Sequence, residues 1–161
     1  MKYILLSTLV FILSFSVYAQ EQSPVTWSAT ILNNNDNTVD FVFMANIKDG
    51  WHLYSQTLES DKGPIPTSFS FTESDDFELV GKTNENPPRK TYDPNFEMEI
   101  AMFEGQAMFS QKLMMKAETM SVSGKISFMV CNDEQCIFPP EEEFLIVKKG
   151  ETLSFTILEK K

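Results

Sequence analysis

Residues 39–47 read Val-Asp-Phe-Val-Phe-Met-Ala-Asn-Ile, and this stretch is the clearest strand in the sequence. Its apolar and mixed positions alternate: Val39, Phe41, Phe43, Ala45 and Ile47 on one side, Asp40, Val42, Met44 and Asn46 on the other. Because successive side chains of a strand point to opposite faces, the first set predicts a buried face and the second a wetter one. Asp49 and Gly50 are turn formers that end the strand.

Further short strands separated by turn signals are predicted on both sides, and no helical period of useful length is present. Eight or nine strands are expected, among them Val25 to Leu32, Phe77 to Val80, Phe96 to Phe103, Ala107 to Met115, Thr119 to Cys131, Phe144 to Val147 and Leu153 to Ile157. Pro87-Pro88 and Asp93-Pro94 predict a long irregular crossing. The pattern indicates an all-β fold, an immunoglobulin-like two-sheet β-sandwich.

The predicted strand from Thr119 ends at the first of only two cysteines. Its alternation puts Val130 on the apolar face and Cys131 on the wetter face. Asn132 and Asp133 are turn formers that let the chain bring Cys136 back beside Cys131, so a disulfide across the turn is plausible. In the chain-entropy model such a small ring stabilises the fold by only about 2 kcal/mol.

The first residues, Met1 to Ala19, form a basic start, an apolar run and an end with small residues, which together predict a secretory signal peptide. Residues 20–161 are then expected to form one domain that is not inserted in a membrane. The alternative is an uncleaved anchor. Export predicts a periplasmic or secreted protein, in an oxidising compartment where a cysteine pair can remain a disulfide.

The composition of the 161 residues, 42% hydrophobic and 22% charged, suits one globular domain. The formal net charge is −10, and loss of Lys2 with the signal peptide makes it one unit more negative. This charge disfavours nucleic acid and anionic membrane surfaces as partners. With a single histidine, no nucleophile elbow and no phosphate-binding glycine loop, hydrolase and nucleotide-binding functions are disfavoured.

Two segments together carry a specific resemblance. The residues Asp-Gly-Trp-His-Leu-Tyr-Ser-Gln at 49–56, followed far downstream by the cysteines at 131 and 136 and by Pro139-Pro140, resemble the N-terminal periplasmic domain of the DsbD thiol:disulfide interchange family. The resemblance covers roughly Val25 to Val147. It implies an immunoglobulin-like sandwich without a cofactor, whose pair Cys131 and Cys136 takes electrons from a thioredoxin-like protein and passes them to exported thiol proteins.

The resemblance also implies neighbours for the cysteine pair. Tyr54 matches a family aromatic near the cysteines, and His52 stands where another aromatic is usual, so both are expected to shield the pair. A mobile cap is expected between Tyr92 and Phe103, with Phe96 or Phe103 as its aromatic, and Cys131 could lie hidden beneath this cap or beneath the turn. The apolar residues 137–140, including Pro139, are expected to help dock a partner, and Cys136 is expected to be the sulfur that is attacked.

The chain departs from the family pattern in two respects. Four residues separate its cysteines, whereas the best-known members have five. It also lacks the membrane domain and the C-terminal thioredoxin domain of the longer family protein, so a separate partner is expected to reduce it.

Acidic residues are concentrated near the cysteines in the sequence. Asp133, Glu134 and the acidic run at 141–143 disfavour a thiolate, so the oxidised pair suits the role of target for an activated partner thiol.

Other interpretations stay open from the sequence alone. The disulfide could be an inert staple in a secreted binding or assembly module. His52 could be an aromatic-like ring satisfied by a backbone carbonyl. Zinc bound by Cys131, Cys136 and His52 lacks an evident fourth ligand, so no metal is predicted. Copper could be held by thioethers, although such methionines more often fill a core; the candidates are Met44, Met108, Met114, Met115 and Met129.

Overall fold

The computed structural model describes residues 23–34, 36–60, 62–150 and 152–158. Within these ranges the chain forms thirteen strands and no helix, which confirms the all-β prediction. The part of the chain that is described thus contains no helix able to cross a bilayer. The predicted signal peptide at Met1 to Ala19 lies outside the described residues.

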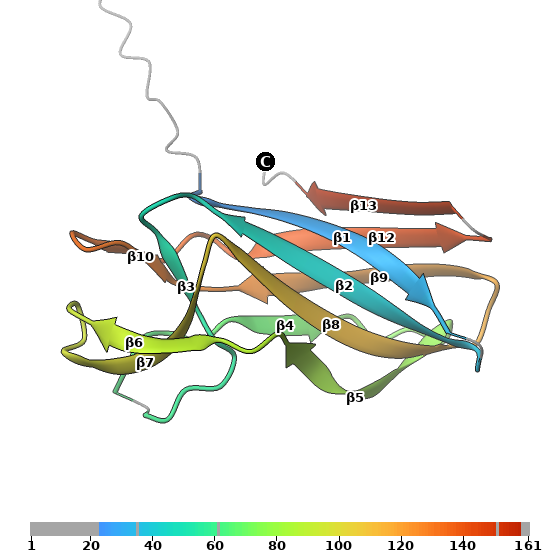
Figure 1. The fold of residues 1–161 in the computed structure, drawn as a ribbon. Coiled ribbons are helices and arrows are strands. Elements are labelled where there is room, and N and C mark those ends of the chain that lie inside the picture. The colour runs from blue at the N-terminus through green and yellow to red at the C-terminus, as the bar shows by residue number, and fades with distance from the viewer. Residues whose placement is uncertain (1–22, 35, 61, 151, 159–161) are drawn as a thin grey trace, which may run out of the picture.

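Two four-stranded antiparallel sheets face each other and form the predicted sandwich (Figure 1). The first sheet contains, in spatial order, β1 (Val25–Asn33), β2 (Thr38–Ile47), β8 (Gln106–Met115) and β5 (Phe77–Glu85). The second contains β13 (Thr152–Leu158), β12 (Glu142–Lys149), β9 (Thr119–Ser127) and β4 (Ser68–Phe71).

The main core lies between these two sheets and is rich in aromatic rings. Phe43 of β2 and Phe144 of β12 come from opposite sheets, have no exposed surface, and place their ring centroids 5.1 Å apart. The alternation predicted for residues 39–47 is confirmed, because all five residues of its apolar set are buried. Burying aromatic rings of this size removes the largest apolar areas from water and holds the two sheets together.

A third sheet at one end of the sandwich carries the cysteines (Figure 1). Its order is β11 (Cys136–Ile137), β10 (Val130–Cys131), β3 (His52–Tyr54), β7 (Met98–Glu104) and β6 (Arg89–Asp93). The short strand β3 is central, since it pairs with β10 on one side and with β7 on the other. The chain enters β3 from β2 through a turn in which Gly50 has a φ of +80°, a conformation that favours glycine.

Two sequence expectations are corrected by this third sheet. The irregular crossing expected between Pro87 and Pro94 contains strand β6, because the prolines flank the strand and leave its backbone N–H groups free to pair with β7. The single strand expected from Thr119 to Cys131 is two strands. Its alternation continues, with Phe128 and Val130 both buried, but the pairing partner changes at residues 128–129 from the second sheet to β3.

Gly124 marks the closest approach within the second sheet. A Cβ atom at this position would lie 2.1 Å from the backbone oxygen of Ser70 and 2.6 Å from Cζ of Phe144. Atoms do not approach so closely, so only glycine lets β4 pair with β9 while the Phe144 ring packs over the same point.

We expect Gly124→Ala to lower the free energy of unfolding by about 3 kcal/mol, because the added methyl group overpacks a site bounded by backbone. Urea denaturation of the two proteins measures the change. Gly63→Ala is the matched control: its Cβ would meet its nearest neighbour at 3.6 Å, an ordinary contact, so a shift within about 0.5 kcal/mol is expected. Equal stability of the two variants would contradict the packing argument.

Candidate functional site

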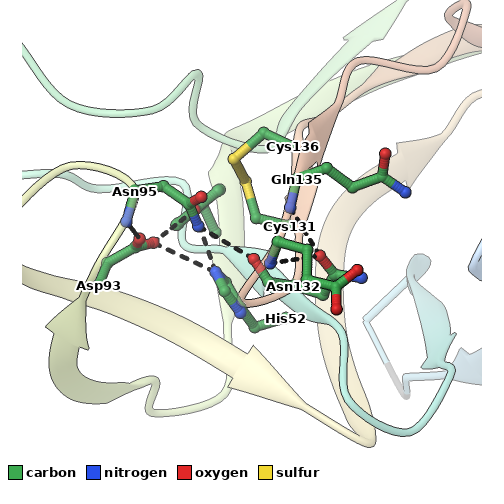
Figure 2. Close-up of a disulfide and its surroundings, with 9 residues drawn as sticks. His52, Asp93, Asn95, Cys131, Asn132, Gln135 and Cys136 are labelled. Carbon is green, nitrogen blue, oxygen red and sulfur yellow. Dashed lines mark hydrogen bonds and ion pairs between the residues drawn. A yellow bond between two sulfur atoms is a disulfide. The ribbon is translucent and has the colours of Figure 1, made fainter.

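Cys131 and Cys136 form a disulfide across the hairpin made by β10 and β11, which we call the cysteine hairpin (residues 130–137; Figure 2). The two residues are direct partners in the antiparallel ladder, with Cα atoms 4.1 Å apart. The next pair closes the hairpin, since the Asn132 N–H donates a hydrogen bond to the Gln135 carbonyl at 2.9 Å. The bridge that the sequence made plausible is therefore present.

Asn132 fixes the shape of the turn between the cysteines. Its side-chain oxygen accepts hydrogen bonds from the backbone N–H groups of Glu134, at 2.9 Å, and Gln135, at 2.8 Å. Asparagine is suited to this role because its short amide can replace backbone partners in a tight turn. The turn is therefore held by its own sequence as well as by the disulfide.

The two sulfur-bearing residues differ in exposure. Cys136 is exposed, whereas Cys131 has no exposed surface and packs with Tyr54, Ile100 and Met102, a group we call the Cys131 cluster. The prediction that Cys131 lies on a wetter face is wrong. Alternation correctly puts it opposite Val130, but a strand pattern does not reveal what other segment covers that face.

The segment that covers Cys131 is the turn between β6 and β7, residues 94–97, which we call the covering turn. Its Asn95 side chain donates a hydrogen bond to the Asn132 carbonyl at 3.0 Å and so joins the turn to the cysteine hairpin (Figure 2). Phe96 packs against the Cys131 cluster, with its ring edge-on to Tyr54 at a centroid distance of 5.9 Å.

Phe103, the other aromatic considered for the cap, lies elsewhere. It is buried in the main core, 5.7 Å from the ring of Phe109. Pro139 follows the cysteine hairpin and is half-buried, beside Phe138, whose exposed fraction is 53%. The structure thus brings Phe96 to the cysteines but not Phe103.

A buried polar group lies beside the disulfide and joins His52, Tyr54 and Asp93. The Tyr54 hydroxyl donates to Asp93 Oδ2 at 2.5 Å, and His52 Nε2 lies 3.0 Å from that hydroxyl and 3.2 Å from Asp93 Oδ2. His52 is also the ladder partner of Cys131. The partners of the His52 ring are thus the side chains of Tyr54 and Asp93, whereas the sequence suggested a backbone carbonyl.

The environment of Asp93 explains its ionisation. Burial by itself raises the pKa of this carboxyl, but hydrogen bonds from the Tyr54 hydroxyl and the Asn95 N–H, together with the nearby His52, outweigh burial and lower the pKa. Burial, and then the Asp93 carboxylate, raise the pKa of Tyr54. Tyr54 therefore stays a protonated donor and Asp93 a charged acceptor at neutral pH.

Sequence reasoning missed Asp93 and Asn95 as site residues. Asp93-Pro94 is a turn signal in the sequence, and 41 positions separate Asp93 from His52, so no local pattern joins the two. The predicted cap between Tyr92 and Phe103 contains both missed residues, and it was the signal that could have identified them.

Zinc or copper binding would require several ligand side chains to lie close together. Among the described residues, no group of three or more His, Cys, Asp or Glu side chains is placed to hold a metal ion. The candidate methionines are dispersed: Met44 and Met108 are cross-strand neighbours on the outer face of the first sheet, Met115 packs on the main core, and Met129 packs on the Cys131 cluster. Met114, which is exposed, lies six positions beyond Met108 on β8.

Comparison with known proteins places these features in a family. The family model described as "Thiol:disulfide interchange protein DsbD, N-terminal" matches residues 20–148. No curated protein sequence matched the chain.

Two solved structures are similar in fold. The N-terminal periplasmic domain of ScsB from Proteus mirabilis aligns with a TM-score of 0.58 and 14% identity, over 81% of this chain and 48% of that chain. This chain therefore spans about half the length of that domain. The N-terminal domain of Neisseria meningitidis DsbD in the reduced form aligns with a TM-score of 0.49 and 13% identity, over 79% of this chain and 88% of that one. The expected two-sheet sandwich is confirmed by the two facing sheets of this chain and by the likeness in fold to the ScsB domain.

The lowered pKa of Asp93 makes a testable contribution to stability. A carboxylate whose pKa is lower in the folded state stabilises the fold above its unfolded pKa of about 3.9 and loses that effect as the pH falls through the folded value. At pH 7 we expect Asp93→Asn to cost about 2 kcal/mol, since it weakens hydrogen bonds to a buried charge.

The difference between wild type and Asp93→Asn should shrink as the pH is lowered from 7 to about 3, measured by urea denaturation at each pH. Asp75→Asn, at an exposed position, is the control and should show almost no cost at any pH. A cost for Asp93→Asn that stayed constant down to pH 3 would contradict the assignment of a charged, hydrogen-bonded Asp93.

Proposed function

This chain belongs to the family of the N-terminal domain of the thiol:disulfide interchange protein DsbD, and from that premise we propose that it passes electrons through Cys131 and Cys136. The donor in this proposal is a thioredoxin-like protein, and the recipients are exported thiol proteins. The predicted signal peptide supports a site of action in the periplasm or outside the cell.

The observation that carries the proposal is the unequal exposure of the two cysteines. Thiol-disulfide exchange requires a thiolate to reach one sulfur in line with the bond that breaks. Cys136 is exposed, whereas Cys131 has no exposed surface beneath the covering turn. A partner thiolate can therefore approach Cys136 and use Cys131 as the leaving group.

Exchange in this proposal occurs in two halves, each of which moves two electrons. The partner thiolate attacks Cys136 Sγ, the Cys131–Cys136 bond breaks, and Cys131 leaves as a thiolate that takes up a proton. The second thiol of the partner then attacks the mixed disulfide and releases Cys136, so the partner is oxidised and the pair is reduced by two electrons. In the second half, Cys136 attacks the disulfide of a recipient, and Cys131 resolves the mixed disulfide and restores the original bridge.

The surroundings of Cys136 suit docking of a partner in trans. Phe138 is among the large apolar side chains exposed in the described residues, at 53%. It follows Cys136 by two residues. An exposed aromatic ring near a reactive bond is typical of the contacts that anchor a transient partner.

Local charge supports the direction of attack. Asp133 and Glu134 are exposed within the hairpin turn, and negative charge near a thiol disfavours its thiolate. The reduced pair is then a weak nucleophile on its own, and the oxidised pair is better suited to attack by a partner with an activated thiol.

Cysteine variants test which sulfur is attacked. We expect Cys131→Ser, which keeps Cys136, to form a covalent adduct with a thioredoxin-like protein that has one cysteine, activated as its thionitrobenzoate disulfide. Cys136→Ser should form the adduct at least about tenfold more slowly, because its thiol is buried and waits for local opening. Non-reducing gels with mass spectrometry of the adducts measure both rates.

The double variant, Cys131→Ser with Cys136→Ser, is the control and should form no adduct, because it has no cysteine to which the thioredoxin-like protein could be attached. Equal rates for the two single variants would remove the assignment of roles while leaving exchange in place. Adducts from neither variant would overturn the electron-transfer function and favour an inert staple in a binding module.

The response of the fold to reduction gives a second test. The main core lies between the two large sheets and does not include Cys131, and the six-residue ring contributes only about 2 kcal/mol in the chain-entropy model. We therefore expect the domain to stay folded in dithiothreitol, with unchanged far-ultraviolet circular dichroism at room temperature. Unfolding on reduction alone would show that the disulfide is a structural requirement.

A further inference from the structure

A cavity of about 330 Å³ lies between the connection from β3 to β4 and the strands β6 and β7; we call it the β7 cavity. The described residues of this connection are 55–60 and 62–67, and in Figure 1 it runs past β6 and β7 at the end of the domain that carries the third sheet. Neither cysteine lines the cavity. Its volume is at the lower end of the range of pockets that hold small ligands.

The floor of the β7 cavity is apolar. Leu58, Met98 and Ile100 line it, together with the buried Pro64. Ile100 belongs to the Cys131 cluster, and Leu58 and Met98 pack against that cluster, so this floor is held by contacts on its far side. The cavity therefore offers an alkyl chain a preformed surface that is removed from water.

One wall of the cavity carries the half-buried carboxylate of Glu85. Its Oε1 accepts a hydrogen bond from the Ser55 hydroxyl at 2.5 Å, and its Oε2 accepts the Gln56 N–H at 2.9 Å. Both donors are neutral, and among the described residues no lysine, arginine or histidine forms an ion pair with Glu85. A carboxylate has about four lone-pair sites, so each oxygen can accept a further hydrogen bond.

The remaining charges of the cavity do not neutralise Glu85. The lining contains one cationic side chain, Lys90, which is exposed and forms its ion pair with Glu59. Glu99 lines the cavity as well and is exposed. Three carboxylates thus face one ammonium group, and the carboxylate nearest to being buried is the one without a cation. This charge favours a positively charged ligand.

We propose that the β7 cavity binds an alkyl chain that ends in a guanidinium group, the chemistry of an arginine side chain or of a small alkylguanidine. The guanidinium pairs with both oxygens of Glu85, and the alkyl chain lies on Met98 and Ile100. A guanidinium suits this place better than an ammonium group, because its planar fork matches a carboxylate in two parallel hydrogen bonds and because it is less strongly hydrated. The proposal does not rest on electron transfer through the cysteines.

The binding test uses the oxidised mature protein at pH 7 and n-butylguanidinium as the probe. Two backbone amides report on the site in nuclear magnetic resonance spectra: that of Gln56, which is bonded to Glu85, and that of Ile100 in the floor. Both should shift in a saturable way, with a dissociation constant of about 1 mM for a ligand of this size. The absence of a saturable shift at these amides would overturn the proposal.

Two matched probes separate the contributions of charge and chain. N-butylurea has the shape of n-butylguanidinium without its charge, and methylguanidinium has the charge without most of the chain. Each should bind at least about tenfold more weakly, because one loses the charge-assisted bonds and the other loses three methylene groups. Equal binding of butylurea would reduce the cavity to an apolar hole, and equal binding of methylguanidinium would reduce it to general attraction by an acidic surface; either result would overturn the proposal.

Two carboxylate variants test the assignment to Glu85. Glu85→Gln removes the charge that lacks a cation and should weaken n-butylguanidinium at least about tenfold. Glu59→Gln is the matched control: it removes a carboxylate of the same cavity that is already paired with Lys90, so a change of less than about threefold is expected. Equal losses would overturn the role of Glu85. Circular dichroism checks that both variants are folded, and the probe series in wild type decides the proposal if Glu85→Gln is not.

A further probe identifies the source of the guanidinium. N-acetyl-arginine amide presents the arginine side chain as a polypeptide does. If it binds as tightly as n-butylguanidinium, the cavity takes an arginine of a partner protein; if n-butylguanidinium alone binds, the cavity takes a small free cation. Either result supports the site. None of these measurements involves thiol-disulfide exchange, so their failure would leave the electron-transfer function untouched, and failure of the cysteine variants to form adducts would leave the cavity untouched.

Discussion

A carboxylate without any exposed surface must have its lone pairs satisfied inside the protein, because leaving a buried charge without partners is very costly. Asp93 meets this requirement with a tyrosine hydroxyl, a histidine ring nitrogen and the N–H of Asn95. These donors come from β3 and from the covering turn itself. Satisfying one charge therefore fixes where the β6–β7 hairpin lies relative to the cysteine hairpin.

The stability of the domain and the chemistry of its cysteines depend on different parts of the chain. The main core fills the space between the two large sheets, whereas Cys131 belongs to a small separate cluster beneath the covering turn. Local opening of such a turn exposes few apolar groups and costs less than global unfolding. The sandwich can thus stay intact while the covered sulfur becomes accessible.

The sequence predicted those features that depend on neighbouring positions. Residues 39–47 alternate strictly because one face of β2 is buried, and Asn132 favours a turn because its side chain can bond the backbone locally. Prediction from the sequence failed where segments that are distant in sequence meet. The prolines that flank residues 89–93 predicted an irregular segment where the structure has an edge strand. The alternation at Cys131 did not predict the covering turn. The Asp93–His52 contact has no counterpart in any local pattern.

The pairing of a buried and an exposed cysteine also bears on oxidative damage. An oxidant that reaches the reduced pair meets Cys136 first and converts it to a sulfenic acid, which a neighbouring thiol can condense with before irreversible products form. Cys131 is its direct ladder partner, with a Cα separation of only 4.1 Å in the bridged form. Oxidation of the exposed sulfur therefore leads back to the same disulfide, so a chance encounter with peroxide costs the domain a pair of electrons but not its cysteines.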